Sequence, residues 1–213
     1  MHKPPELDLD PEVMGDITAQ AKRHLRGRMR ALREALPEQA WAARNSRVLG
    51  QLRVLPELSR ARRVALFAPM RRKREIDLTD LHEELRSRGA ELYYPFMDPV
   101  GGTYQTGFRP VDSLTELTHR GRGFREPDPA RAAAARGHID LVIVPALAVA
   151  PTGHRVGYGA GFYDATLPDA CPPALSVAVV FDFQLTIEVP TTERDVACDI
   201  VVTESDVIRA GRA

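Results

Sequence analysis

The chain has 213 residues, with 29 Lys plus Arg against 29 Asp plus Glu, so its formal net charge is zero. At about 150 residues per domain this length predicts one domain, and zero net charge disfavours a highly cationic nucleic-acid binder or an acidic solvating tail. The charge is unevenly distributed, because residues 22–74 hold 16 basic and three acidic residues, whereas the rest holds 13 basic and 26 acidic ones. We therefore expect one end of the protein to attract anions.

The two cysteines, Cys171 and Cys198, are too few for a disulfide scaffold and too far apart for a CxxC site. The acidic N-terminus has no apolar stretch typical of a secretory signal. The longest uncharged apolar run, residues 141–150, is half of the roughly 20 residues needed to span a bilayer. We expect a cytoplasmic protein without a membrane partner.

In chain order, residues 1–10 are expected to form a flexible leader and residues 11–213 a single domain. Apolar residues at helical spacing predict helices over 11–36 and 38–52, which carry much of the basic excess. After them, short apolar runs alternate with polar helical stretches, a pattern typical of β/α units. Strands are predicted at 64–68, 91–96, 104–108 (an edge strand), 139–144, 175–181 and 200–203. Helices are predicted at 79–88 and 130–136, with turns and loop over 112–129.

The predicted fold class is therefore α/β. We expect one three-layer domain with a mainly parallel or mixed central sheet, helices on both faces of the sheet, and an N-terminal helical arm.

Three glycines alternate with other residues after the predicted strand 139–144, namely Gly157, Gly159 and Gly161, and Arg155 precedes them. Glycines allow backbone N–H groups to approach an anion, a following helix N-terminus adds a favourable dipole, and an arginine offers a planar set of donors. Taken alone, such a loop is as often only a turn between a strand and a helix. It matches neither the dinucleotide-binding fingerprint nor a P-loop, which disfavours a dehydrogenase or a Walker NTPase.

The segment Val144-Pro-Ala-Leu to Arg155-Val-Gly-Tyr-Gly-Ala-Gly-Phe-Tyr-Asp164 resembles the signature of the 5-formyltetrahydrofolate cyclo-ligase (5,10-methenyltetrahydrofolate synthetase) family. Two further regions match in the expected order: the family's Lys-x-x-Leu-Arg at residues 22–26, and its Asp-x-x-x-Asp-x-Val-Thr-Glu-like stretch at residues 195–204. The similarity covers about residues 22–204. Tyr104, Arg122 and Arg194 stand where the family usually has Met, a large aromatic residue and His.

This resemblance implies an ATP-dependent ring closure, in which the γ-phosphate activates the formyl oxygen of 5-formyltetrahydrofolate and N10 then attacks the formyl carbon. Catalytic roles are implied for Arg155, Tyr163 and Lys22. Nucleotide contacts are implied for Lys22, Arg26, Arg155, Gly157, Tyr158, Gly159, Ala160, Gly161, Phe162, Tyr163 and Asp164. Magnesium is expected at Asp164 and Asp195, with Asp199 a less favoured third, and folate contacts at Glu75, Tyr104 and Arg122.

Each of these residues also has a purely structural interpretation. Lys22 and Arg26 lie four apart, hence on one helix face, and an Arg-rich helix more often presents a solvated surface. Asp164 can simply favour a helix N-terminus, Asp195 can be a loop carboxylate, and an aromatic such as Tyr163 after a glycine loop often only packs.

Three hypotheses therefore stand at this point. The first is the cyclo-ligase enzyme with ATP and Mg, acting on small molecules as a monomer or weak dimer. The second is a non-catalytic relative that binds a nucleotide or folate as a regulatory module. The third treats the Arg-rich arm as an RNA-binding surface, which its apolar stripe and its lack of an aromatic platform disfavour.

Overall fold

The structure, a computed structural model, describes residues 10–121 and 123–211. Two expectations lie outside these residues: the leader, except for Asp10, and the folate contact of Arg122. The carboxylate of Asp10 accepts a hydrogen bond from the Glu12 N–H (2.8 Å) and so caps the first helix.

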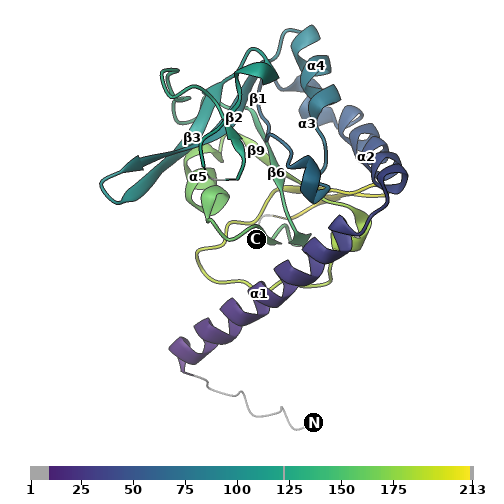
Figure 1. Cartoon of the computed structure of the whole chain (residues 1–213), viewed down its shortest axis with the longest axis vertical. Helices are drawn as coiled ribbons and strands as arrows, with labels where there is room; N and C mark the ends of the chain where they lie inside the picture. Colours follow the sequence, from purple (N-terminus) through teal and green to yellow (C-terminus); the bar gives the residue numbers. More distant parts are fainter. Residues whose placement is uncertain (1–9, 122, 212–213) are drawn as a thin grey trace.

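A seven-stranded mixed sheet forms the centre of the molecule, in the order β11-β10-β9-β6-β1-β2-β3 (Figure 1). Its strands are β1 (Arg63–Ala65), β2 (Glu91–Val100), β3 (Thr103–Pro110), β6 (Leu141–Pro145), β9 (Leu175–Val179), β10 (Ile200–Val202) and β11 (Val207–Arg209). The five inner strands run parallel, and β3 and β11 pair antiparallel at the two edges. Two small antiparallel pairs lie outside it: β4 (Thr118–His119) with β5 (Arg125–Glu126), and β7 (Ala148–Val149) with β8 (Arg155–Val156).

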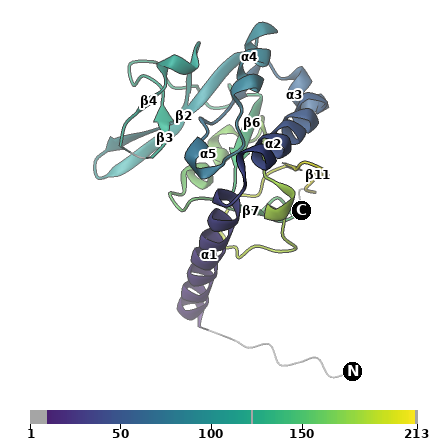
Figure 2. The ribbon, with the colours of Figure 1, turned by 45° about the vertical axis from the view of Figure 1, so that its right-hand side comes forward.

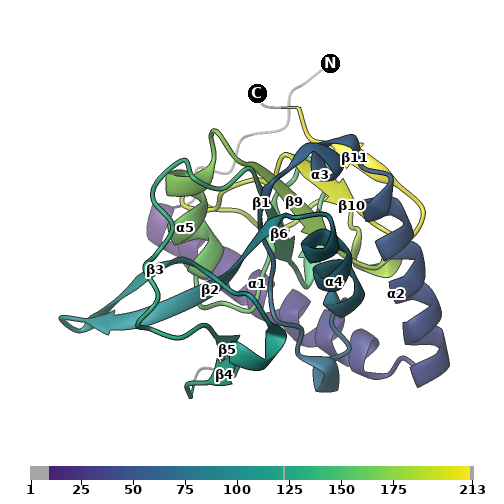
Figure 3. The same ribbon diagram turned by 90° about the horizontal axis from the view of Figure 1, so that it is seen from above.

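Helices cover both faces of this sheet (Figure 3). They are α1 (Pro11–Glu34), α2 (Glu38–Arg53), α3 (Pro56–Arg60), α4 (Thr79–Ser87) and α5 (Phe162–Ala170), with three short 3-10 turns, η1 (Arg71–Lys73), η2 (Leu114–Glu116) and η3 (Asp182–Gln184). Alternate strand residues point to opposite faces, so Val64 packs with α2, α3 and α4, whereas Ala65 packs with α5. The expected α/β fold with a mixed sheet and helices on both faces is confirmed.

Helix α1 forms the expected N-terminal arm, and its N-terminal half extends beyond the body of the protein (Figures 1 and 2). Its C-terminal half packs on the β7–β8 pair, where Met29 is buried against Leu147 and Val156. No helix among the described residues is both long enough and apolar enough to cross a membrane.

The helix predicted over residues 130–136 is wrong, because this segment consists of turns and extended chain. Alanines favour a helix locally, but here the backbone bonds to the neighbouring strand instead. The Ala134 N–H donates to the Phe108 carbonyl (2.8 Å), and Arg109 Nε donates to the Arg131 carbonyl (2.8 Å). Sequence patterns also did not reveal α3, β11 and the two small strand pairs, which have only two to five residues per element.

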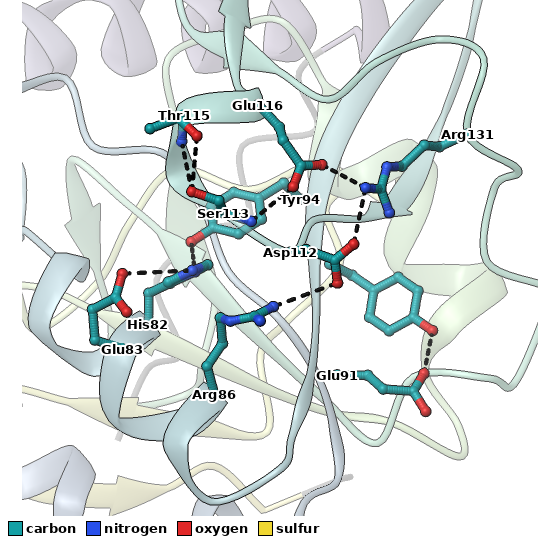
Figure 4. A network of polar contacts seen from close by, with 11 residues as sticks. His82, Glu83, Arg86, Glu91, Tyr94, Asp112, Ser113, Thr115, Glu116 and Arg131 are labelled. Carbon is teal, nitrogen blue, oxygen red and sulfur yellow. Dashed lines mark hydrogen bonds and ion pairs between the residues drawn. The ribbon is translucent and has the colours of Figure 1, made fainter.

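A polar network holds β2 against α4 and the segment that follows β3 (Figure 4). Buried His82 shares a hydrogen bond with the Tyr94 hydroxyl (2.9 Å), and burial lowers the pKa of His82. Arg131 reaches both Asp112 (2.9 Å) and Glu116 (2.7 Å). These contacts fix β2 just before Pro95, which lines the cavity described next.

Candidate functional site

One cavity of about 520 Å³ opens beside the carboxyl ends of β1 and β6 and the middle of β2. The chain runs from β1 to β2 on one side and later returns to β6 on the other side of β1, so the strand order reverses there. Ligands of α/β proteins bind at such a switch point. The predicted site residues on its wall are Lys22, Arg26, Glu75, Tyr104, Arg155, Gly157, Tyr158, Gly159, Ala160, Gly161, Phe162, Tyr163, Asp164 and Asp195.

Asp199, the less favoured metal candidate, does not line this cavity. One of its carboxylate oxygens accepts hydrogen bonds from the backbone N–H (2.8 Å) and hydroxyl (2.9 Å) of Ser176. Asp199 therefore ties β9 to the segment that leads into β10, and its metal role is not supported.

The glycine-rich loop connects β8 to α5. Gly159 and Gly161 have φ angles of +104° and +70°, a region that favours glycine, and Gly161 is the N-cap of α5. The first backbone hydrogen bond of α5 runs from the Ala165 N–H to the Gly161 carbonyl (3.0 Å). Within the described part of the chain, no backbone N–H of residues 157–164 donates a hydrogen bond. This loop is therefore able to bind an anion through several N–H groups and a helix N-terminus.

Arg155 lies under this loop and is almost fully buried. Its Nη2 donates to Asp164 Oδ1 (2.9 Å), and its Nη1 donates to the Val196 carbonyl. The Val196 N–H donates to the same Asp164 oxygen (3.2 Å). The guanidinium that we predicted to face phosphate thus pairs with the carboxylate that we predicted to bind metal.

Lys22 and Asp195 form a second ion pair on the same side of the cavity, with Lys22 Nζ 2.5 Å from Asp195 Oδ2. Both side chains are largely buried. Burial acts to raise the pKa of Asp195, but hydrogen bonds from Lys22 and Thr192 outweigh it and hold that pKa below the usual value. A helix residue and a loop residue 173 positions apart thereby meet at one site.

Helix α1 also binds the loop through its arginines. Arg26 Nε donates to the Gly157 carbonyl (2.9 Å), and a Cβ added at Gly159 would lie 3.4 Å from the Arg26 guanidinium carbon. Arg30 Nη2 donates to the Tyr158 carbonyl (3.4 Å). The basic face of the arm is therefore packed on the loop, and the interpretation of Lys22 and Arg26 as a purely solvated face is wrong.

Glu75 lies across the cavity, in the chain segment between η1 and α4, and is only 2 % exposed. Its Oε2 accepts a hydrogen bond from the Met70 N–H (2.6 Å), but its buried Oε1 has no partner among the described residues. The buried hydroxyl of Tyr163 also has no partner there. Burial and the nearby Glu75 carboxylate raise the pKa of Tyr163. Buried polar atoms left unpaired inside a cavity are candidates for ligand contacts, because leaving them unpaired costs free energy.

The remaining wall is mostly apolar and suits a flat ring. Beside Tyr104 on β3, it contains Phe67, Pro95, Met97, Phe124 and Pro145. Lys73 also lines the cavity, and it was not among the predicted site residues although it lies two residues before Glu75 in a basic run. Its position so close to Glu75 in the sequence is the signal from which Lys73 could have been predicted.

The carboxylates of the site can bind a magnesium ion only together with oxygen atoms of a bound ligand. The described residues contain no group of three or more His, Cys, Asp or Glu side chains that could hold a metal. Asp164 Oδ2 and Asp195 Oδ1 accept no hydrogen bond from described residues and lie on the cavity wall. Magnesium commonly takes one or two protein carboxylates together with phosphate oxygens and water, so this donor set fits.

A family model for the 5-formyltetrahydrofolate cyclo-ligase family matches residues 18–204. The chain is also similar to the 5-formyltetrahydrofolate cyclo-ligase of Escherichia coli K12, with 28% identity over 183 residues that cover 84% of this chain and 98% of that protein. Similarity to the cyclo-ligase of Mycolicibacterium smegmatis reaches 48% over 82 residues, 38% of this chain and 42% of that protein.

Among solved structures, the chain is similar to the 5,10-methenyltetrahydrofolate synthetase of Aquifex aeolicus, with a TM-score of 0.76 and 30% identity over 90% of this chain and 95% of that one. The 5,10-methenyltetrahydrofolate synthetase of Mycoplasma pneumoniae shares the fold, with a TM-score of 0.65 and 18% identity over 89% of this chain and 99% of that one.

Proposed function

The chain belongs to the 5-formyltetrahydrofolate cyclo-ligase family of enzymes, and we propose that it converts 5-formyltetrahydrofolate to 5,10-methenyltetrahydrofolate with ATP and Mg. One observation carries this proposal. A single cavity has an anion-binding loop and two carboxylates on one side, and a buried carboxylate with an unpaired oxygen on the other. A polyanion and a heterocycle with N–H donors can therefore occupy it together.

The loop side suits the triphosphate of ATP. Phosphoryl transfer depends mainly on charge neutralisation and positioning of the phosphates. We assign the phosphates to the N–H groups of residues 157–164, with Lys22 and Arg26 as the cations at the rim. Asp164 and Asp195 would hold magnesium, which when bound neutralises charge on the phosphate oxygens. Arg155 orients Asp164, because its guanidinium already binds that carboxylate.

The Glu75 side suits the pterin ring. An aminopyrimidinone presents adjacent N–H donors, and the free Oε1 of Glu75 is an acceptor for them. The apolar wall around Pro95 and Met97 covers the faces of the ring, and the Tyr163 hydroxyl is available to the formyl group or the transferred phosphate. In the proposed reaction the formyl oxygen, bound between the two halves of the cavity, accepts the γ-phosphoryl group of ATP and ADP leaves. N10 then attacks the formyl carbon and loses its proton, and phosphate leaves from that carbon to give the methenyl product.

The test is an absorbance assay for the methenyl product with purified protein, 5-formyltetrahydrofolate and MgATP. We expect product formation that requires both ATP and Mg. Binding of both ligands without product would instead support the non-catalytic relative. The absence of product and of binding at saturating ligand concentrations would refute the proposal.

We propose a cytoplasmic protein that acts on small molecules as a monomer or weak dimer, without a nucleic-acid or membrane partner. Sedimentation across a range of protein concentrations tests the oligomeric state. A steep salt dependence of RNA affinity would favour the RNA-binding hypothesis instead.

A further inference from the structure

Arg33, near the C-terminal end of α1, is a buried cation that the mechanism above does not use; it is 2 % exposed. Its Nε donates to the Lys73 carbonyl (2.6 Å), and its Nη2 donates to the Tyr158 hydroxyl. A buried guanidinium needs such partners, because an unpaired one would be strongly destabilising. One side chain thus connects α1 to η1 and to the glycine-rich loop.

Tyr158 has its backbone on one half of the cavity and its side chain towards the other. Its backbone belongs to the glycine-rich loop and accepts a hydrogen bond from Arg30. Its ring centre lies 5.5 Å from the Arg33 guanidinium and 5.1 Å from the Lys73 ammonium. Burial and the neighbouring Glu75 carboxylate raise the pKa of Tyr158. The phenol is therefore enclosed between cations of α1 and η1 and the carboxylate of Glu75.

Besides Tyr158, the η1 turn also connects Arg33 to Glu75 through hydrogen bonds. Arg33 donates a hydrogen bond to the carbonyl of Lys73, the last residue of η1. On the other side of η1, the N–H of Met70 donates to Glu75 Oε2. Arg74 ends this turn in the left-handed region (φ +51°), a conformation that costs free energy for a residue other than glycine. Its guanidinium forms an ion pair with Glu38 of α2. The position of Glu75 thus depends on η1 and Tyr158 together.

We propose that Arg33 and Tyr158 are positioning residues that couple the two halves of the cavity, so that an anion bound by the glycine-rich loop orders the Glu75 carboxylate for its ligand. The proposal rests on the proposed function, which supplies the two ligands. The N–H groups of residues 157–164 are unpaired within the described part of the chain, and a bound phosphate would fix their backbone, including that of Tyr158. Because the Tyr158 hydroxyl accepts a hydrogen bond from Arg33 and Glu75 is a neighbour of the phenol, fixing the loop restricts the carboxylate. Such coupling is reciprocal, so folate also tightens nucleotide binding.

The test variant is Tyr158→Phe, which keeps the ring among its cations and removes only the hydroxyl. Calorimetry measures the Kd of 5-formyltetrahydrofolate with and without a non-hydrolysable ATP analogue plus Mg. For the wild-type protein we expect the nucleotide to tighten folate binding by at least about fivefold. For Tyr158→Phe we expect this ratio to fall to about one, with nucleotide affinity alone within about twofold of wild type. In turnover, KM for folate should rise by the lost coupling, at least about fivefold, while kcat changes by less than about threefold.

Two further variants sharpen this test. Arg33→Lys keeps the charge but loses the pair of directed donors, and it should reduce the ratio, whereas Arg28→Lys on the exposed face of the same helix should not. If Arg33→Lys does not fold, Tyr158→Phe still decides the question. A ratio of one in the wild-type protein, or a wild-type ratio retained by Tyr158→Phe, overturns the coupling alone. A wild-type protein that binds neither ligand overturns the proposed function as well.

Discussion

The two sides of the cavity differ in how their charged groups are satisfied. On the loop side, Arg155 pairs with Asp164 and Lys22 pairs with Asp195, so two of the three predicted phosphate-binding cations hold a predicted metal-binding carboxylate. On the opposite side, Glu75 Oε1 is buried without a partner in the described structure. The charged groups of the loop side thus satisfy one another and leave one oxygen of each carboxylate free of hydrogen bonds from described residues, whereas the Glu75 side presents a buried oxygen that a ligand can satisfy.

The largest expected effect comes from breaking the buried pair on the loop side. Arg155→Ala removes the donor to the Val196 carbonyl and one of the two donors to Asp164 Oδ1, the other being the Val196 N–H. We expect a loss of about 2.5 kcal/mol in the free energy of unfolding, because Arg155 is buried in its ion pair while Asp164 is 34 % exposed and regains water. Denaturant unfolding measures it, with exposed Arg194→Ala as the control. A variant as stable as the wild type would show that the pair is not structural.

The next effect is specific to the opposite side. Glu75→Gln keeps the shape of the side chain but replaces the charged acceptor by a neutral amide. We expect 5-formyltetrahydrofolate to bind about 30-fold more weakly, a loss of about 2 kcal/mol, which is typical of one charge-assisted hydrogen bond. Nucleotide affinity should stay within about twofold of the wild-type value. Titration of each ligand separately measures this, with exposed Glu188→Gln as the control. An equal loss for both ligands would contradict the division of the cavity.

The smallest expected effect concerns the Lys22–Asp195 ion pair on the loop side. Asp195→Asn removes a carboxylate that pairs with Lys22. With Mg present we expect ATP to bind about fivefold more weakly, a loss of about 1 kcal/mol, and the difference should vanish without Mg. Exposed Glu193→Gln in the same loop is the matched control. Equal weakening with and without Mg would mean that Asp195 does not act through the metal.

The same pair predicts a pH dependence of stability. The pKa of Asp195 is lower in the folded protein than in the unfolded chain. The pair therefore stabilises the fold fully above the unfolded pKa, and this contribution is lost as the pH falls through the folded pKa. In Asp195→Asn, the acid end of the stability profile should be flatter than in the wild type.

The uneven charge along the sequence has a structural cause beyond ligand attraction. Many basic residues of segment 22–74 pair with acidic residues elsewhere in the chain, such as Arg44 with Glu204 and Arg63 with Asp140. Others, including Arg26 and Arg30, bind carbonyl groups of the glycine-rich loop. We expected the basic segment 22–74 as a whole to attract anions, and that expectation was too broad. Of its basic residues, Lys22, Arg26 and Lys73 line the cavity.

Local sequence patterns were sufficient to predict the main helices and strands and most of the polar residues on the cavity wall. The strands around the sheet centre are continuous apolar runs, because both of their faces are buried, and that signal is independent of the rest of the fold. The glycine-rich loop was predictable because its alternate glycines, with Arg155 before them and Asp164 after them, form a pattern confined to neighbouring residues. Very short elements such as β11 were not predictable, because their hydrogen bonds come entirely from a neighbouring strand. The helix prediction for residues 130–136 failed for the same reason, since hydrogen bonds to Phe108 and Arg109 overrode the helical preference of the alanines.

The sequence by itself determined the fold class, the loop and the chemical types of the site residues, because these depend on patterns within a few neighbouring positions. Only the tertiary structure decided which charges meet. Lys22 and Asp195 are 173 positions apart, and Arg33 reaches Tyr158 from 125 positions away. Partners at such separations are selected by the packing of α1 against β7 and β8, and no local pattern encodes that packing. The tertiary fold also buries Glu75 and Tyr163, each with a polar atom that has no partner among the described residues, and this feature defines the cavity as a site.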